Sequence, residues 1–251
     1  MKGTLLLVPN ALDLGAEAVD LQDVLPLGVI RRAAALRHWA AEDARSARAF
    51  LKRVDAICPL GVALQAIAIT ELPRPRKGSR EPVPAAAWQA LLQPALDGQD
   101  LGLISEAGLP AVADPGAALV QAAHAAAVAV LPLSGPSSLL MALSASGLNG
   151  QSFAFVGYPP QDAATRTLRL RELEALSRRN GQTQILIETP YRNAALLDGL
   201  LSALVPQTLL SVSCGLTLPG GWTRTDAVAG WRKTPQAMPD RWPAVFSLLA
   251  R

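Results

Sequence analysis

The sequence predicts an α/β protein built from two α/β domains, and three observations support this prediction. Short apolar runs bounded by turn residues alternate with longer stretches of helical spacing. Half of the 251 residues are hydrophobic and 17% are charged, which is typical of chains that fold around a core. The length suits one large domain or two medium ones, and the composition changes after residues 147–150. We therefore expect domains at residues 1–150 and 151–251.

Six apolar runs are predicted as strands because turn residues bound each of them. The runs are Leu5–Val8, Gly102–Ser105, Val128–Leu133, Phe153–Val156, Gln184–Glu188 and Ala244–Leu249. Three prolines precede the last run, which predicts an antiparallel strand at a sheet edge.

Helical spacing predicts six helices between these strands. They cover Glu42–Val54, Ala85–Leu96, Gly116–Ala127, Ser137–Ser146, Asp162–Arg179 and Tyr191–Leu204. Alternation of strands and helices predicts mostly parallel sheets with helices on both faces and ligand-binding loops at the carboxyl ends of the strands.

Composition argues against a membrane protein, a secreted protein and a metalloprotein. The longest alanine-rich apolar stretch, Ala117–Leu133, contains Gln121, His124 and Pro132, so we expect no bilayer span. The first apolar run lacks a cleavage pattern and is predicted to be a strand rather than a signal peptide. Two cysteines far apart predict reduced thiols and a cytoplasmic protein. Neither the cysteines nor the two histidines have ligand spacing, so no metal is expected.

Charge gives a weaker indication of the partner. The formal net charge of +3 does not by itself indicate a nucleic-acid-binding protein. The basic stretch at residues 71–84 and the arginines between 166 and 179 favour a polyanionic acceptor, although solvated surface is the more common explanation of such charge runs.

The most informative segment is ISEAGLPAVADPG at residues 104–116. A predicted strand delivers Ser105 and Glu106 into a turn of small residues at 107–110, where a ligand can approach the backbone. Further along, Asp114 fits a helix N-cap, followed by a proline at the first helical position.

A second junction of strand, turn and helix lies at residues 131–147, with Gly135 and Pro136 before Ser137 and Ser138. Either serine can cap the helix, and both together beside a glycine suggest a ligand site. The chain lacks GxGxxG after its first strand, GxxxxGK[ST] and GxSxG, which argues against NAD, ATP and hydrolase sites.

Three ordered segments, GLISEAGLPAVADPG, PLSGPSSLLMALSASGL and ILIETPYRNAALLDGL, resemble the tetrapyrrole methylase superfamily. The segments GTLLLVP, AAEDARSARAFL and FAFVGYPP extend the likeness over most of the chain. The branch that it most resembles methylates a cytidine 2′-hydroxyl in small-subunit ribosomal RNA (rRNA). The resemblance implies a homodimer of two-domain subunits that hold S-adenosylmethionine (SAM) in a cleft between the domains.

Carried onto this sequence, the resemblance implies that three loops bind the cofactor. These are Ser105, Glu106, Ala107, Gly108, Leu109 and Pro110; Gly135, Pro136, Ser137 and Ser138; and Glu188, Thr189 and Pro190. Methyl transfer needs alignment more than acid or nucleophile chemistry, but a hydroxyl acceptor also needs a base.

Glu42, Asp43 and Glu106 are the candidate bases. For Glu42 and Asp43 the alternative is a helix cap with local ion pairs, and Glu106 can also cap or pair locally. Downstream, Arg192 can hold a phosphate or serve packing.

The chain departs from the rRNA branch at residues 10–13, at Glu106, at Leu109 and at 218–225. These departures leave three functions open. The first is methylation of rRNA or a ribosomal subunit, the second is carbon methylation of a tetrapyrrole, and the third is a non-catalytic SAM-binding or RNA-binding relic.

Overall fold

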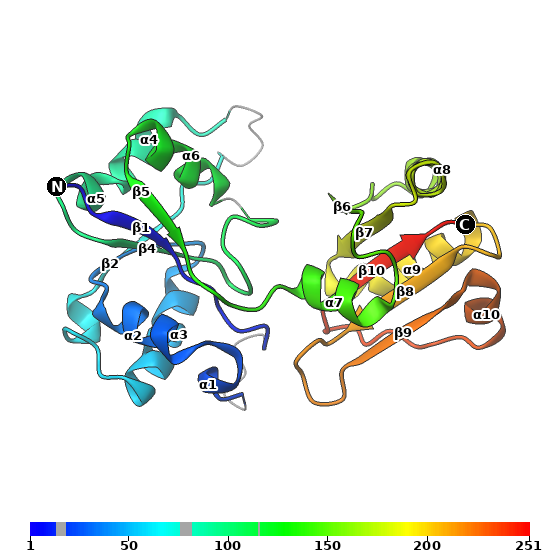
Figure 1. The fold of residues 1–251 in the computed structure, drawn as a ribbon, viewed down its shortest axis with the longest axis horizontal. Coiled ribbons are helices and arrows are strands. Elements are labelled where there is room, and N and C mark those ends of the chain that lie inside the picture. The colour runs from blue at the N-terminus through cyan, green and yellow to red at the C-terminus, as the bar shows by residue number, and fades with distance from the viewer. Residues whose placement is uncertain (14–18, 76–81, 115) are drawn as a thin grey trace. The chain divides into compact units, whose positions relative to one another are not determined.

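The computed structural model describes residues 1–13, 19–75, 82–114 and 116–251 (Figure 1). Part of the basic stretch at 71–84, and the proline expected to open a helix at 115, lie outside these residues. Contacts divide the chain into two compact units, Met1–Ser137 (unit 1) and Ser138–Arg251 (unit 2). No helix of the described residues is long and apolar enough to cross a bilayer.

Unit 1 contains one five-stranded sheet in the order β3-β2-β4-β1-β5, and every neighbouring pair in it is parallel. The strands are β1 (Thr4–Leu7), β2 (His38–Ala41), β3 (Ala68–Glu71), β4 (Leu101–Ile104) and β5 (Ala129–Pro132). The helices are α1 (Leu21–Val24), α2 (Leu27–Ala35), α3 (Ala44–Ile57), η1 (Leu64–Ala66), α4 (Ala85–Leu91), α5 (Gln93–Leu96) and α6 (Ala117–Ala125).

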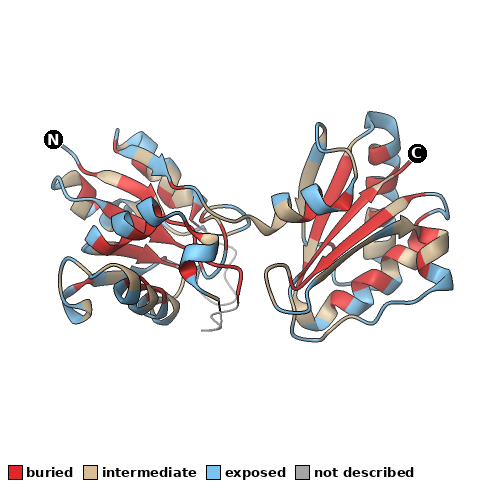
Figure 2. Ribbon diagram, turned by 60° about the horizontal axis from the view of Figure 1, so that its bottom comes forward, coloured by how far each residue is buried: buried red, intermediate tan, exposed pale blue. Residues whose placement is uncertain are grey.

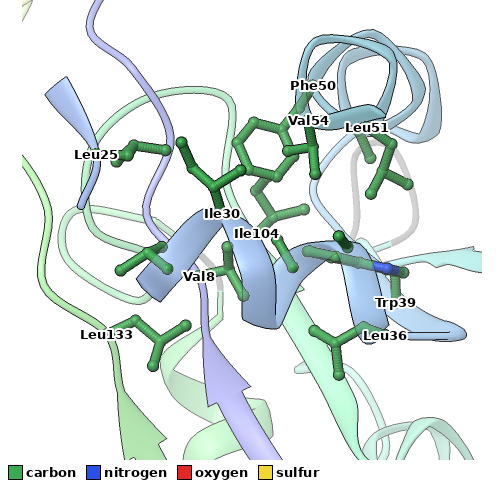
Figure 3. Close-up of a cluster of buried hydrophobic side chains, with 14 of the residues drawn as sticks. Val8, Leu25, Ile30, Leu36, Trp39, Phe50, Leu51, Val54, Ile104 and Leu133 are labelled. Carbon is green, nitrogen blue, oxygen red and sulfur yellow. The ribbon is translucent and has the colours of Figure 1, made fainter. Parts of the chain in front are cut away.

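Alternation along the strands gives this sheet two apolar faces, because successive side chains point to opposite sides. Val8 and Ile104 pack on one face with α2 and α3, where the Phe50 ring meets Trp39 edge-on at 6.1 Å between centroids (Figure 3). Leu5 and the other strand side chains that point to the opposite face of the sheet pack with α4, α5 and α6. The prediction of a parallel sheet with helices on both faces is confirmed in unit 1.

The helix predicted over residues 85–96 is broken at Leu92, between α4 and α5. Pro94 has no N–H to donate to the carbonyl of Ala90, and its ring crowds the preceding turn. Proline therefore explains why two short helices replace one long helix.

Unit 2 contains a mixed sheet in the order β6-β7-β10-β8-β9, in which only the β6–β7 pair is parallel among the described strands. The strands are β6 (Phe153–Gly157), β7 (Thr183–Glu188), β8 (Leu209–Cys214), β9 (Trp222–Ala227) and β10 (Ala244–Leu249). The helices are α7 (Ser138–Ser146), α8 (Ala163–Asn180), η2 (Pro190–Arg192), α9 (Asn193–Ala203) and α10 (Val228–Lys233).

The strand β10 lies inside its sheet, so its predicted place at the edge is wrong although its antiparallel direction is right. It pairs with β7 on one side and β8 on the other, and all but its last residue are buried (Figure 2). The prolines before it mark the approaching loop, where no ladder hydrogen bond is needed.

The division between the units falls before α7, whereas the sequence analysis places it after residue 150. In the structure Ala142 and Leu143 of α7 pack with Ile185 and Val245 of the unit-2 sheet. The Thr225 hydroxyl also donates to a carbonyl near the end of α7. The composition change at 147–150 thus marks the loop between α7 and β6, inside unit 2.

Candidate functional site

The carboxyl edge of the unit-1 sheet gathers the loops that the sequence analysis selected. The strands β1 and β4 are parallel neighbours, with Leu7 opposite Leu103, so both open at this edge. The connection from β1 leads to α2 on one face, and that from β4 leads to α6 on the other face. Adjacent strands whose connections leave toward opposite faces form a switch point, where open α/β sheets bind ligands.

Asn10 ties the two loops together. Its side-chain amide donates to the carbonyl of Ser105 at 3.3 Å and to that of Glu106 at 2.9 Å. Its side-chain oxygen accepts from the N–H of Ala11, and its backbone pairs with Gly108. In the sequence, residue 10 stands out only as a departure from the family pattern, and the local signal for its role is an asparagine just after a predicted strand.

Asp13 anchors the same segment to α3. Arg53 donates from one guanidinium nitrogen to Asp13 at 2.6 Å and to the Val19 carbonyl at 2.8 Å. The Asp13 side chain is 2% exposed, so this ion pair is shielded from water. The residues at 10–13, which depart from the family pattern, therefore help to hold the loop after β4 in place.

Two glycines of the predicted site do not tolerate a side chain, one because of its backbone conformation and the other because a neighbouring residue fills the space. Gly108 has φ +70°, the left-handed region that L side chains rarely adopt, and a Cβ there would lie 3.4 Å from Leu12. A Cβ on Gly135 would lie 2.3 Å from the Pro9 ring. The close approach of the Pro9 ring thus explains the glycine at position 135, where the sequence predicts open space for a ligand.

The turn after Gly108 also holds two alanines in the left-handed region, Ala111 at φ 66° and Ala113 at φ 65°. Such a conformation costs an L-residue about 1–2 kcal/mol, and strained positions cluster at ligand loops. The strain lies in the segment that the sequence analysis ranked first.

Two of the three predicted bases lie together at this edge. Glu42 follows β2, and its carboxylate accepts from the backbone N–H of Glu106 at 3.2 Å. The Glu106 side chain is exposed. Its partial desolvation, together with the charges of Glu42 and Asp43, raises its pKa above the ordinary value.

Asp43 has a structural role as the N-cap of α3. Its carboxylate accepts from the Ser46 N–H at 2.7 Å and from the Ser46 hydroxyl at 3.0 Å. These hydrogen bonds to Ser46 lower the pKa of Asp43. The helix-cap interpretation of Asp43 is confirmed, and these hydrogen bonds make its carboxylate a weaker base than an ordinary aspartate.

Asp114 is not the cap that the sequence analysis expects, because α6 begins at Ala117 with Gly116 as its N-cap. Burial first, then the charges of Glu42 and Glu106, raise the pKa of Asp114 to about 6. The Ser105 hydroxyl is buried and lacks a conventional hydrogen bond among the described residues, yet it lies close enough to lower that pKa partly. Asp114 is thus a fourth carboxyl beside the loop.

A hollow of about 700 Å³ opens beside these residues in unit 1. Its lining is Asn10, Asp13, Asp43, Arg45, Ser46, Ala49, Phe50, Arg53, Glu106 and Ala107. It therefore combines carboxylates with two arginines and the exposed start of the loop. Within the described parts of the chain, no group of three or more His, Cys, Asp or Glu side chains is arranged to hold a metal ion.

The remaining predicted site residues lie around these loops and in unit 2. Leu109 is half-buried and Pro110 buried in unit 1, Pro136 and Ser137 end unit 1, and Ser138 opens α7. Glu188 ends β7 in unit 2, followed by Thr189 and Pro190. The Glu188 carboxylate accepts from the Thr189 N–H at 2.7 Å and pairs with Arg192 at 2.9 Å.

The amino-acid sequence is similar to those of several curated bacterial proteins. Ribosomal RNA small subunit methyltransferase I of Halalkalibacterium halodurans is 32% identical over 200 residues, which is 80% of this chain and 60% of the relative. The Vibrio cholerae protein of that name is 40% identical over 116 residues, 46% of this chain and 39% of the relative. The chain thus spans about two fifths to three fifths of these relatives' length.

Two solved structures share the fold. The methyltransferase CobJ matches with a TM-score of 0.58 and 17% identity over 99% of this chain and all of its own. Uroporphyrin-III C-methyltransferase from Thermus thermophilus, in complex with S-adenyl homocysteine, matches with a TM-score of 0.53 and 19% identity, covering 98% of this chain and 97% of that one.

The fold and the site define a class of protein that has two α/β units. In the first unit, loops of the kind that bind ligands lie at the carboxyl edge of a parallel sheet and are held by hydrogen bonds. The sequence profile of the Tetrapyrrole (Corrin/Porphyrin) Methylases matches residues 28–220. The chain belongs to this family.

Proposed function

We propose that this protein is a SAM-dependent methyltransferase that methylates a cytidine 2′-hydroxyl of small-subunit rRNA. Family membership and the names of its relatives support the proposal. The observation that carries it is the loop after β4, which Asn10 braces and which presents the exposed Glu106 beside Glu42.

The loop residues suit SAM. When bound, SAM supplies an electrophilic methyl group on a cationic sulfonium. The exposed Glu106 carboxylate favours a nearby positive charge. Gly108 keeps side-chain atoms away from the turn.

The chain's own residues then have to remove a proton. As the acceptor oxygen bonds to the methyl carbon and the carbon–sulfur bond breaks, the hydroxyl proton passes to a base. Glu106 is the best placed of the predicted bases, because it is exposed, its pKa is raised and no ion pair holds it among the described residues. Asp43 is occupied at the helix start, and Glu42 supports the backbone of Glu106.

The cellular setting and assembly belong to the same proposal. The free thiols of Cys58 and Cys214 support a reducing compartment, the cytoplasm. The homodimer rests on the family resemblance alone. Light scattering on a sizing column measures it directly, and a monomer at micromolar concentration would contradict it.

Two measurements test the activity. Calorimetry should detect about one SAM per chain, and the same for its demethylated product; neither heat nor a thermal shift would contradict the proposal. Incubation with labelled SAM and small subunits from a strain lacking the gene should label rRNA at a 2′-hydroxyl. Label on a precorrin-type acceptor instead would favour tetrapyrrole methylation, and SAM binding without label on either acceptor would favour the relic.

A further inference from the structure

Both tyrosines of the chain are exposed, and both lie at one edge of the unit-2 sheet. Tyr158 directly follows β6 and is 57% exposed, and Tyr191, in η2 after β7, is 73% exposed. The strands β6 and β7 are parallel neighbours, with Gly157 opposite Leu186. Because carboxyl ends of parallel strands meet at the same edge, the two rings belong to one surface, here called the tyrosine edge (Tyr158, Tyr191 and Arg192).

Arg192 lies over the second ring, which still keeps most of its surface exposed. Its guanidinium carbon lies 5.5 Å from the centroid of the Tyr191 ring, within cation–π range. The same guanidinium pairs with the buried Glu188 carboxylate at 2.9 Å and donates to the Thr189 hydroxyl at 3.1 Å. A buried carboxylate therefore fixes the arginine, and the arginine restricts an otherwise exposed ring.

Packing does not explain these rings. A tyrosine with most of its surface in water contributes little to the core, and among the described residues the Tyr191 ring contacts the Arg192 guanidinium rather than core side chains. A held and exposed aromatic ring beside an arginine is instead the arrangement by which proteins stack unpaired bases.

Two arginines lie near this edge, and the Asp162 carboxylate that caps α8 lies beside one of them. Tyr158 is followed by a short loop and then by α8, whose first turns carry Arg166; its guanidinium donates to the Gln161 carbonyl at 3.1 Å. Arg192 keeps 24% of its side chain exposed. Positive charge next to stacking rings suits a phosphodiester backbone better than the apolar centre of a protein interface.

We infer that the tyrosine edge is a stacking platform for unpaired bases of a single-stranded RNA segment, with Arg192 facing the backbone phosphates. The inference rests on the proposed rRNA acceptor and names the surface that holds it. Loss of one stacking ring should therefore weaken RNA binding by roughly five-fold to a hundred-fold.

The test compares Tyr191→Ala, Tyr191→Phe and Phe153→Ala. Phe153 is a matched control because it is 41% exposed but opens β6, at the amino end of the same strand pair. Fluorescence anisotropy with a short labelled oligocytidylate measures RNA affinity, and calorimetry measures SAM affinity. Tyr191→Ala should lose roughly ten-fold in RNA affinity, Tyr191→Phe should lose less than about two-fold, and Phe153→Ala should not change. SAM affinity should stay constant in all three.

Three results would overturn the platform: wild-type RNA affinity in Tyr191→Ala, an equal loss in Tyr191→Phe, or a parallel loss of SAM affinity that assigns the ring to the cofactor. A wild-type protein that methylates rRNA without binding the oligonucleotide would refute the platform and leave the proposed function standing. A protein that binds the oligonucleotide through Tyr191 but transfers no methyl group would refute the proposed function alone.

Discussion

Asn10 and Gly108 exchange two backbone hydrogen bonds, each N–H donating to the other's carbonyl, over 2.9 and 3.1 Å. This bridge joins the residues after β1 to the turn after β4, at the switch point of the unit-1 sheet. The loop that presents Glu106 is therefore held by residues distant in the sequence.

Replacing Asn10 by alanine should loosen this loop. Two carbonyls, of Ser105 and Glu106, lose their side-chain donor at a buried position. The free energy of unfolding should fall by about 1–3 kcal/mol, because buried acceptors are left unsatisfied. Urea denaturation measures the loss and calorimetry should show weaker SAM binding. Asn180→Ala, at the exposed end of α8, is the control; equal losses in both variants would contradict the brace.

Replacing Asp114 by asparagine should stabilise the protein at alkaline pH. A carboxyl whose pKa rises from 3.8 to about 6 on folding binds its proton more tightly in the folded state. The free energy of unfolding of the wild type therefore falls as pH rises from about 4 to about 6. It stays at the lower value above about pH 6. After allowance for solvent screening, Asp114→Asn should gain about 1–2 kcal/mol at about pH 8 and nothing near pH 4.

Asp162→Ala is the control for this prediction, because its effect on stability should depend on pH in the opposite direction. Asp162 caps α8, and its hydrogen bonds to Thr165 lower its pKa. Its stabilising contribution is present above the unfolded pKa and disappears as pH falls, so this variant should be less stable than wild type at neutral pH and approach it in acid. A gain for Asp114→Asn that is independent of pH would contradict the assignment of that group.

Glu106→Gln should affect SAM more than its demethylated product. The sulfonium is cationic and the product's thioether is neutral, so the charge interaction, worth up to about 1 kcal/mol for a solvent-exposed pair, is lost for SAM alone. We expect a roughly three- to ten-fold weaker SAM affinity and a larger fall in kcat. Calorimetry and single-turnover methylation measure the two effects.

Asp43→Asn is the control for Glu106→Gln, because it distinguishes a helix-capping role of Asp43 from a role as catalytic base. Asparagine also accepts from the Ser46 N–H and retains the helix start, so stability should stay close to wild type. Methylation should continue in Asp43→Asn. A fall in kcat as large as that of Glu106→Gln would transfer the role of base to Asp43.

Gly135→Ala should destabilise unit 1, because the added methyl group would overlap the Pro9 ring. Overpacking of this kind costs about 1–3 kcal/mol, which thermal unfolding will register. Gly150→Ala is the matched control, since no atom lies within 4 Å of a Cβ there. If Gly135→Ala folds with wild-type stability, the space beside Gly135 is open and the ligand interpretation of that glycine returns.

Sequence periodicity predicted the strands whose apolar runs are continuous, such as β1 and β4. It missed β2, β3, β8 and β9, and β2 and β8 illustrate two different reasons. The strand β2 is only four residues long and contains two alanines, although Trp39 is a central core residue. In β8 Ser211 and Ser213 interrupt the apolar run, yet both are buried, and their hydroxyls pair with Thr225 and Thr223 across the ladder.

The sequence by itself determined the alternation of elements, the family and the loop at residues 104–116, because these depend on local periodicity, turn chemistry and ordered motifs. The tertiary structure alone decided which carboxylates share an edge, that Asn10 braces the loop, and that α7 belongs to unit 2. Those features depend on pairing between residues far apart in the chain. A hydrogen bond from Asn10 to Glu106 or the desolvation of Asp114 has no local pattern that reveals it.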